Sequence, residues 1–149
     1  MGGMLAGKPG LVVIHMGGSP RRMVDLCAAL RQGADPGRIT MSSDAGGSQP
    51  IFDSTGECIG LGTTTSATLL QELRRMLFRE GLPLETALRF FTENPARVLG
   101  QSRRKGAVAP GADADLLVLS EDYQVRHVMA KGREAVGAGQ AVLKGKFES

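Results

Sequence analysis

The sequence is poor in the residues that cross-link or brace a small protein. Its 149 residues include no tryptophan, one tyrosine and two cysteines. Cys27 and Cys58 make neither a disulfide framework nor a CxxC metal pair, so we expect two unpaired thiols. No apolar run approaches the roughly 20 residues that cross a bilayer, and no membrane partner is therefore expected.

Charge is not concentrated in any part of the sequence. There are 18 Lys and Arg against 15 Asp and Glu, a net charge of +3, and aromatic residues make up 4%. Nucleic-acid binding usually needs a basic stripe, often with aromatic side chains, so we expect no nucleic-acid partner. The hydrophobic fraction of 42% predicts a soluble folded chain. Residues 1–8 lack the order of a secretory signal, which makes the cytoplasm the expected location.

Apolar patterns near the N-terminus predict an α/β unit. Residues 11–14 are a short β-branched run that suits a buried strand, and this strand ends at His15. Residues 19–32 carry apolar side chains at helical spacing behind Ser19, which resembles a helix cap. Residues 38–42 have the pattern of a second strand, so the segment predicts strand, helix and strand.

Two amphipathic helices are predicted after a loop over residues 46–62. Ser66 is a candidate cap for the first helix, and Gly81 is its expected end. The apolar face of the first helix consists of Leu69, Leu70, Leu73, Met76 and Leu77. The second helix begins behind Pro83, and its apolar positions are Leu84, Ala87, Leu88 and Phe91. Residues 94–100 then predict a short helical turn.

The composition changes after Gly106 to short strands separated by glycine turns. The predicted strands are residues 115–119, 125–130, 133–136 and 141–147. Together they predict a small antiparallel β unit. A sheet of this size has few residues with which to cover its own apolar face, so we expect it to pack on something else.

Polar groups at the ends of the two N-terminal strands are the candidate site. His15 is either a metal ligand, as strand-end imidazoles often are, or a hydrogen-bonded structural residue. Asp44 is either a metal ligand and proton carrier, or a cap for the Gly46-Gly47 turn. Ser48 offers a hydroxyl to a carboxylate. His127, in a predicted C-terminal strand, is interpreted as structural.

Other catalytic patterns are absent from the sequence. No GK[ST] follows the double glycine, no GxGxxG is present, and a serine-hydrolase GxSxG is missing as well. These absences argue against a phosphate-binding loop, a dinucleotide site and a serine nucleophile. The candidate site therefore depends on the two strand ends.

Four patches, in this order, resemble isoaspartyl (β-aspartyl) dipeptidases of the amidohydrolase superfamily. They are residues 3–10, 13–17, 38–44 and 47–50. Residues 94–100, 105–106, 110–111 and 113–119 resemble the wider superfamily. The resemblance implies an α/β fold: a partial (β/α)8 hydrolase barrel over residues 1–104, with strands similar to the fifth and eighth. Residues 105–149 would be the C-terminal strands of a composite β-sandwich.

The same resemblance implies a chemistry for the site. The family binds two divalent metals, usually zinc, and hydrolyses dipeptides linked through an aspartyl β-carboxyl group. His15 is similar to a metal-ligating histidine. Asp44 is similar to the aspartate that ligates metal and acts as general acid and base, and Ser48 to a serine that holds the substrate.

Several parts of the family pattern are missing. The HxH pair, the carbamylated lysine and the second histidine have no counterpart, and only 28 residues separate His15 from Asp44. We therefore expect a C-terminal portion with an internal deletion, whose retained strands expose apolar faces and favour association, including a homo-oligomer. Two hypotheses remain: a metal-dependent β-aspartyl peptidase, alone or within a larger assembly, and a non-catalytic remnant or binding module.

Overall fold

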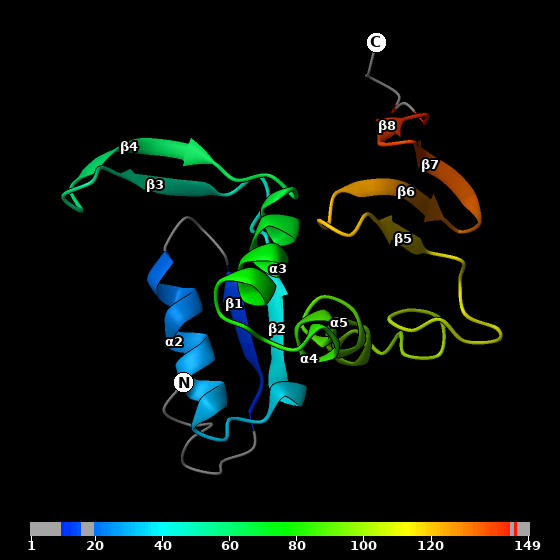
Figure 1. The fold of residues 1–149 in the computed structure, drawn as a ribbon, viewed down its shortest axis with the longest axis horizontal. Helices are drawn as coiled ribbons and strands as arrows, with labels where there is room; N and C mark the ends of the chain where they lie inside the picture. The colour runs from blue at the N-terminus through cyan, green and yellow to red at the C-terminus, as the bar shows by residue number, and fades with distance from the viewer. Residues whose placement is uncertain (1–9, 16–19, 144, 146–149) are drawn as a thin grey trace.

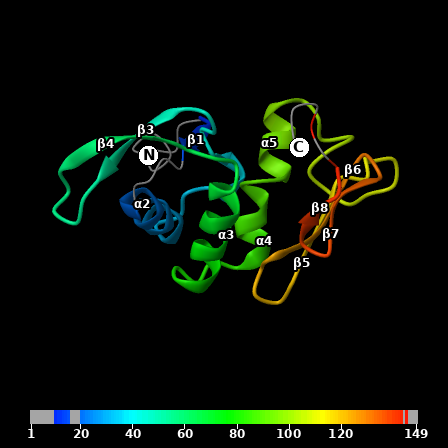
Figure 2. The ribbon, with the colours of Figure 1, turned by 90° about the horizontal axis from the view of Figure 1, so that it is seen from above.

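The computed structural model describes residues 10–15, 20–143 and 145, without the side chains of 15 and 20–22. Figure 1 shows strands and helices at the centre, a projecting hairpin on one side and a separate C-terminal sheet on the other. Figure 2, the view from above, shows the same separation. Within the described residues, no helix is both long and apolar enough to span a membrane.

A parallel pair of strands forms the centre of the fold. Strand β1 (Val12–His15) pairs with β2 (Ile39–Ser42) in a register that runs from Val12 opposite Ile39 to His15 opposite Ser42. Helix α2 (Pro20–Arg31) connects them. This confirms the predicted strand, helix and strand. Ser19, the expected cap, lies outside the described residues.

A 3-10 turn and a buried asparagine fix the entry into β2. The turn, η1 (Pro36–Arg38), is capped by Asp35, whose Oδ1 accepts the Gly37 N–H at 2.8 Å. Asn94 is fully buried, and its Nδ2 donates to the carbonyls of Pro36 at 2.8 Å and Ile39 at 2.7 Å. The chain that turns into β2 is thereby tied to a helix 55 residues further along the sequence.

Three helices follow, close to their predicted positions. They are α3 (Thr68–Phe78), α4 (Leu84–Arg89) and α5 (Glu93–Val98). The Ser66 cap is wrong, because the residue before α3 is Ala67 and no side chain caps the helix. Gly81 does have the left-handed φ of 66° that suits a residue just beyond a helix.

The segment predicted as a loop over residues 46–62 contains a β-hairpin. Strand β3 (Ser48–Phe52) pairs antiparallel with β4 (Cys58–Thr63). The prediction was wrong because both strands are short and carry proline or glycine, which lower strand propensity. Figures 1 and 2 show that the hairpin extends away from α4, α5 and the C-terminal sheet.

The C-terminal sheet is antiparallel, as predicted. Its strands, in sheet order, are β5 (Leu116–Leu119), β6 (Val125–Ala130), β7 (Arg133–Gly137) and β8 (Gln140–Ala141). The last strand is much shorter than the predicted 141–147, and residues 144 and 146–149 lie outside the described residues. Leu117 and Val118 are about half exposed, so this sheet leaves apolar surface uncovered.

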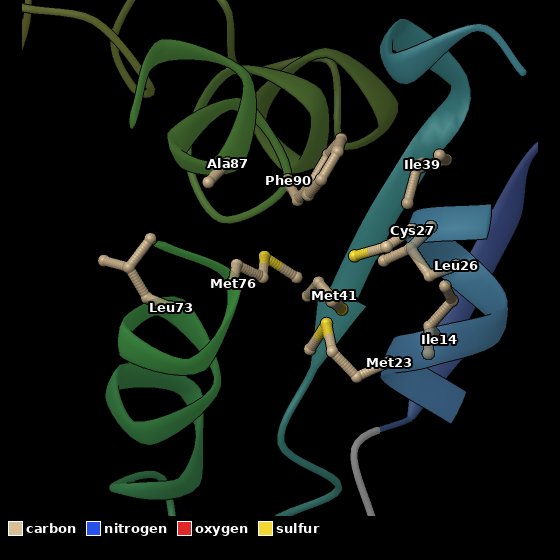
Figure 3. Packing of buried hydrophobic residues seen from close by; sticks show 10 residues of the cluster. All are labelled: Ile14, Met23, Leu26, Cys27, Ile39, Met41, Leu73, Met76, Ala87 and Phe90. Carbon is tan, nitrogen blue, oxygen red and sulfur yellow. The ribbon is translucent and has the colours of Figure 1, made fainter. Parts of the chain in front are cut away.

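One buried cluster packs the two strands against α2, α3 and α4. Figure 3 shows its residues, which are Ile14, Met23, Leu26, Cys27, Ile39, Met41, Leu73, Met76, Ala87 and Phe90. The predicted apolar face of α2 is therefore confirmed at Met23, Leu26 and Cys27. Phe90 is fully buried, whereas the expected Phe91 is only partly buried. All ten residues precede the C-terminal sheet.

Removing the Asn94 amide should destabilise the fold. Asn94→Ala deletes both hydrogen bonds to the β2 entry and leaves the buried Ile39 carbonyl without this donor, so we expect a loss of about 2 to 3 kcal/mol. Arg89→Gln, which breaks an exposed pair with Glu93, is the control and should cost about 0.5 kcal/mol or less. Urea denaturation measures both, and equal losses would contradict this role for Asn94.

The Cys27 thiol should make stability fall at alkaline pH. Burial, with Glu80 nearby, raises the pKa of Cys27 from 9.0 to about 11, although Arg31 opposes the shift. In the unfolded chain the Cys27 thiol loses its proton at a lower pH than in the folded chain. The contribution of the raised pKa to the free energy of unfolding is therefore complete below pH 9 and is lost as the pH rises to about 11. Urea midpoints over this range should fall more steeply for the wild type than for Cys27→Ala; parallel curves would contradict the expectation.

Candidate active site

The ends of β1 and β2 lie side by side because the two strands are parallel and in register. His15, the last residue of β1, is opposite Ser42, the last residue of β2, and Asp44 follows two residues later. In Figure 1 both carboxyl ends point toward the base of the β3–β4 hairpin. The backbone therefore brings two predicted site positions to one edge. The side chain of His15 lies outside the described part of the chain.

Asp44 occupies a tight turn directly after β2. Its φ is 52°, a left-handed conformation that few non-glycine residues adopt, although aspartate tolerates it better than most. The Gly47 N–H donates to the Asp44 carbonyl at 2.9 Å, and Gly46 takes a φ of 83° within this turn. The turn explains why glycine follows Asp44: a positive φ is needed at Gly46.

Side chains from the hairpin hold Asp44 in place. Gln49 Nε2 donates to Asp44 Oδ2 at 2.6 Å, and the Thr64 hydroxyl donates to the Asp44 carbonyl. On the other side, the Ser42 hydroxyl oxygen accepts the Asp44 N–H at 3.2 Å. Ser42 and Thr64 thus hold the backbone of Asp44, while Gln49 holds its carboxylate through Oδ2.

Gly47 is required by the carboxylate itself. A Cβ at this position would lie 3.0 Å from the Cγ, Oδ2 and carbonyl oxygen of Asp44. Glycine often lets a ligand approach the backbone closely. The structure shows that the side chain approaching Gly47 is that of Asp44.

Ser48 begins β3, pairs with Thr63 and is exposed. It lies one residue beyond the Asp44 turn, so the predicted substrate-holding position adjoins the predicted catalytic one. Among the hydrogen bonds of the described residues, none joins the Ser48 side chain to Asp44. The two side chains are neighbours on the chain without being a bonded pair.

The described residues do not form a metal centre. No group of three or more His, Cys, Asp or Glu side chains is placed to hold an ion within the part that the structure describes. A catalytic zinc normally has three protein ligands, and the predicted set in this sequence is His15 and Asp44. The residues present therefore do not fit the family's two-metal centre on their own.

A surface concavity with a volume of about 1010 Å³ lies beside the candidate site, between the hairpin and the start of α3. Its lining runs from Gln49 to Gly56 and includes Gly62–Thr65 and Thr68, so Gln49 borders both the concavity and Asp44. At the hairpin tip, the Thr55 hydroxyl and the Glu57 N–H lower the pKa of Asp53. The Asp53 carboxylate therefore accepts its hydrogen bonds from residues of its own turn.

His127 lies far along the chain, in β6 of the C-terminal sheet. Its Nδ1 is 2.9 Å from Glu134 Oε1, and both side chains are about half exposed. The pair joins neighbouring strands of one sheet, which agrees with the structural interpretation of His127.

Sequence reasoning missed Gln49 and Thr64. Gln49 lies within residues 47–50, which carry part of the resemblance, and Thr64 lies beyond the expected loop. Hydrogen-bond donors that reach back from a hairpin leave no periodic signal in a sequence. The spacing of five residues between Asp44 and Gln49 would have been informative only once the turn was known.

Comparison with known proteins identifies the family. The model of the amidohydrolase family matches residues 21–135, which is most of the chain. The chain belongs to the amidohydrolase family. This confirms the superfamily that the sequence patches indicated, and with it a portion of a (β/α)8-type hydrolase fold.

The individual relatives differ in activity. An adenine deaminase from Methanothrix thermoacetophila is 39% identical over 54% of this chain and 14% of its own length. An N-acetylglucosamine-6-phosphate deacetylase from Danio rerio is 34% identical over 72% of this chain and 26% of its own length. The β-aspartyl dipeptidase of Fervidobacterium islandicum AW-1, solved with a β-Asp-Leu dipeptide, matches with a TM-score of 0.78 and 30% identity, over 96% of this chain and 38% of that enzyme.

The matches identify the family and not one particular member of it. This chain spans between about a seventh and two fifths of the relatives it matches. Members of the family are hydrolases that generally use divalent metals, whereas dipeptidase, deaminase and deacetylase relatives all occur among the matches. Family membership therefore does not fix the substrate.

Replacing Gly47 should displace Asp44. Gly47→Ala puts a methyl group 3.0 Å from the carboxylate, so we expect a loss of about 1 to 2 kcal/mol and shifted amide resonances at Asp44 and Thr64. Gly60→Ala, in the same hairpin, meets no atom within 4 Å and is the control. Urea denaturation and amide NMR measure the effects; unchanged Thr64 and Asp44 resonances in Gly47→Ala would contradict this packing.

Proposed function

We propose that this chain carries the acid/base and substrate-holding part of a metal-dependent hydrolase for β-aspartyl dipeptides. On this proposal Asp44 is the catalytic carboxylate, His15 and Asp44 are metal-binding positions, and Ser48 contacts the substrate. The zinc centre is completed by residues outside this sequence. Residues 1–104 form the barrel portion and residues 105–149 the β-sandwich portion.

The parallel register of β1 and β2 is the observation that carries this proposal. Because His15 ends one strand and Asp44 follows the other, both positions lie at the carboxyl edge of the sheet. Functional groups in α/β barrels gather at this edge, since the strand ends and the loops after them meet there. Two positions separated by 28 intervening residues are brought together without any contribution from the C-terminal sheet.

The placement of Asp44 supports the proposed role in proton transfer. Its left-handed backbone and the Gly47 turn fix the direction of the carboxylate, and Gln49 holds Oδ2 at 2.6 Å. A carboxylate held this way can take a proton from a water molecule and return it to the leaving amine nitrogen of a split peptide bond. Fixing the side chain beforehand lowers the entropic cost of reaching that geometry.

The substrate class rests on the β-aspartyl dipeptidase match. In structural superposition that enzyme covers 96% of this chain with a TM-score of 0.78, whereas the N-acetylglucosamine-6-phosphate deacetylase of Mycobacterium smegmatis covers 85% with a TM-score of 0.64. The exposed Ser48 hydroxyl, directly beyond the Asp44 turn, is suited to accept or donate a hydrogen bond to a dipeptide carboxylate. Both features favour an acidic dipeptide over a purine or a sugar phosphate.

The second candidate function is a non-catalytic binding module. The hydrogen bond from Gln49 to Asp44 Oδ2 favours the binding module. A carboxylate that already accepts a hydrogen bond from a neutral amide has a structural role when no metal is bound. The described residues also lack a three-ligand cluster. Under this candidate, the turn at Asp44 serves only to start the hairpin.

Complementation distinguishes the two candidates. We would co-express this chain with the part of the Fervidobacterium dipeptidase that it does not match, add zinc, and measure β-Asp-Leu hydrolysis. We expect activity that Asp44→Asn lowers at least about 100-fold, because general acid/base groups contribute factors of this size. Asp53→Asn, on the hairpin tip, is the control and should keep the activity.

Three results would count against the hydrolase. Equal activity of Asp44→Asn and the parent mixture would remove the catalytic role of Asp44. Turnover of adenine or N-acetylglucosamine 6-phosphate in place of the dipeptide would remove the substrate class. A folded complex that hydrolyses none of these compounds would leave the binding module as the better account.

A further inference from the structure

The β3–β4 hairpin stands apart from the rest of the chain. Its strands form a separate two-stranded sheet, and none of its residues belongs to the buried cluster. Figures 1 and 2 both show it projecting beyond α2 and α3. A two-stranded hairpin is marginally stable in water, whereas three or more strands with an apolar face are self-supporting. The hairpin therefore gains much from a further strand.

The two strands carry apolar side chains and no charge. Leu61 is 75% exposed and Ile59 is 64% exposed, with Ile51 and Phe52 about half exposed. The acidic groups Asp53 and Glu57 lie at the tip, beyond the strands. Edge strands of monomeric proteins usually carry charge that prevents pairing with other chains, and this device is absent from both strands.

Hydrogen bonds at the two ends of the hairpin show which groups face outward. The Asp53 N–H donates to the Glu57 carbonyl at 3.0 Å, and the Thr64 N–H donates to the Gly47 carbonyl at 3.4 Å. Since bonding direction alternates along an antiparallel strand, Gly62 bonds inward like Thr64, and Leu61 bonds outward. Proline at position 50, opposite Leu61, agrees with this, because it has no N–H to offer the partner strand.

The two outer edges consequently differ. On β3, Pro50 lacks the outward N–H that an added strand needs. On β4, Leu61 and Thr63 direct complete backbone groups outward, and no hydrogen bond to them is found among the described residues outside the hairpin ladder. A β-bulge opposite Ile51 and Phe52 ends the regular part of this edge. Of the two hairpin strands, β4 alone offers an open edge.

We propose that the open edge of β4 pairs antiparallel with β4 of a second copy, about a two-fold axis at Leu61. The result is a four-stranded sheet in the order β3, β4, β4 and β3. In this register Leu61 faces Leu61, and Gly60 faces Gly62. The inference concerns assembly and does not depend on the proposed catalytic function.

A second copy suits this edge better than an unrelated partner. A two-fold contact places each residue near the axis against its own copy, so a charged strand would repel itself. The strand β4 is uncharged, and the antiparallel arrangement sends the two acidic tips in opposite directions. The exposed Leu61 side chain then packs beside Leu61 of the second copy.

Sedimentation tests the proposal directly. We expect the wild-type chain to sediment at twice its mass of 15.7 kDa, and Leu61→Lys, which sets two ammonium groups against each other, to sediment as a monomer. Leu117→Lys is the matched control, since Leu117 is an exposed leucine on the outer strand of the C-terminal sheet. A monomeric wild type, or an assembly that survives Leu61→Lys, would overturn the proposal, as would dissociation by Leu117→Lys alone.

Cross-linking tests the register. In a Cys58→Ser background, Leu61→Cys should form a disulfide-linked dimer under mild oxidation, because facing Cα atoms of a bonded pair lie about 5.5 Å apart. Thr63→Cys should not, because its copy lies about 14 Å away in this register. Equal cross-linking by both variants, or by neither, would overturn the two-fold axis at Leu61. Circular dichroism confirms that the compared variants are folded.

Discussion

The buried amide of Asn94 is the constraint on which the arrangement of the site depends. It donates to Pro36 and Ile39, where the chain turns into β2, while the Phe90 carbonyl accepts the Met41 N–H at 3.0 Å. Thus α4 and α5 occupy the edge of β2 that β1 leaves free. A strand fixed on both edges has a defined end, and that end carries Asp44. Asn94 belongs to residues 94–100, which resemble the superfamily. Its role is therefore structural, and it is not part of the candidate site.

The sequence predicted the parts of the fold that depend on local periodicity. The parallel unit, the apolar face of α2 and the strands of the C-terminal sheet follow from spacing, and the structure has them. The β3–β4 hairpin was missed because Pro50, Gly60 and Gly62 weaken its strand signal. Phe90 was missed because α4 is a short helix, so one residue of rotation decides which phenylalanine enters the core.

The candidate site was likewise predicted only in part from the sequence. Spacing and resemblance placed Asp44 and His15 at the ends of two strands, and the structure pairs these strands so that the two positions lie side by side. They did not reveal that Gln49 and Thr64 return from the hairpin to hold Asp44, since such contacts depend on a turn with left-handed residues. The hairpin consequently has two roles: its base orients the carboxylate, and its open edge is available for assembly.

The central claim is that the His15 and Asp44 positions lie at one edge of the β1–β2 sheet, where both can contact the same metal ion. Amide NMR during titration with Co²⁺ tests it most directly, because a paramagnetic ion perturbs nearby resonances even when a two-ligand site binds weakly. The account predicts that residues at the ends of β1 and β2 shift and broaden first, and that Asp44→Asn removes the effect. Perturbation centred on Asp53 and Glu57, or on the C-terminal sheet, would contradict it.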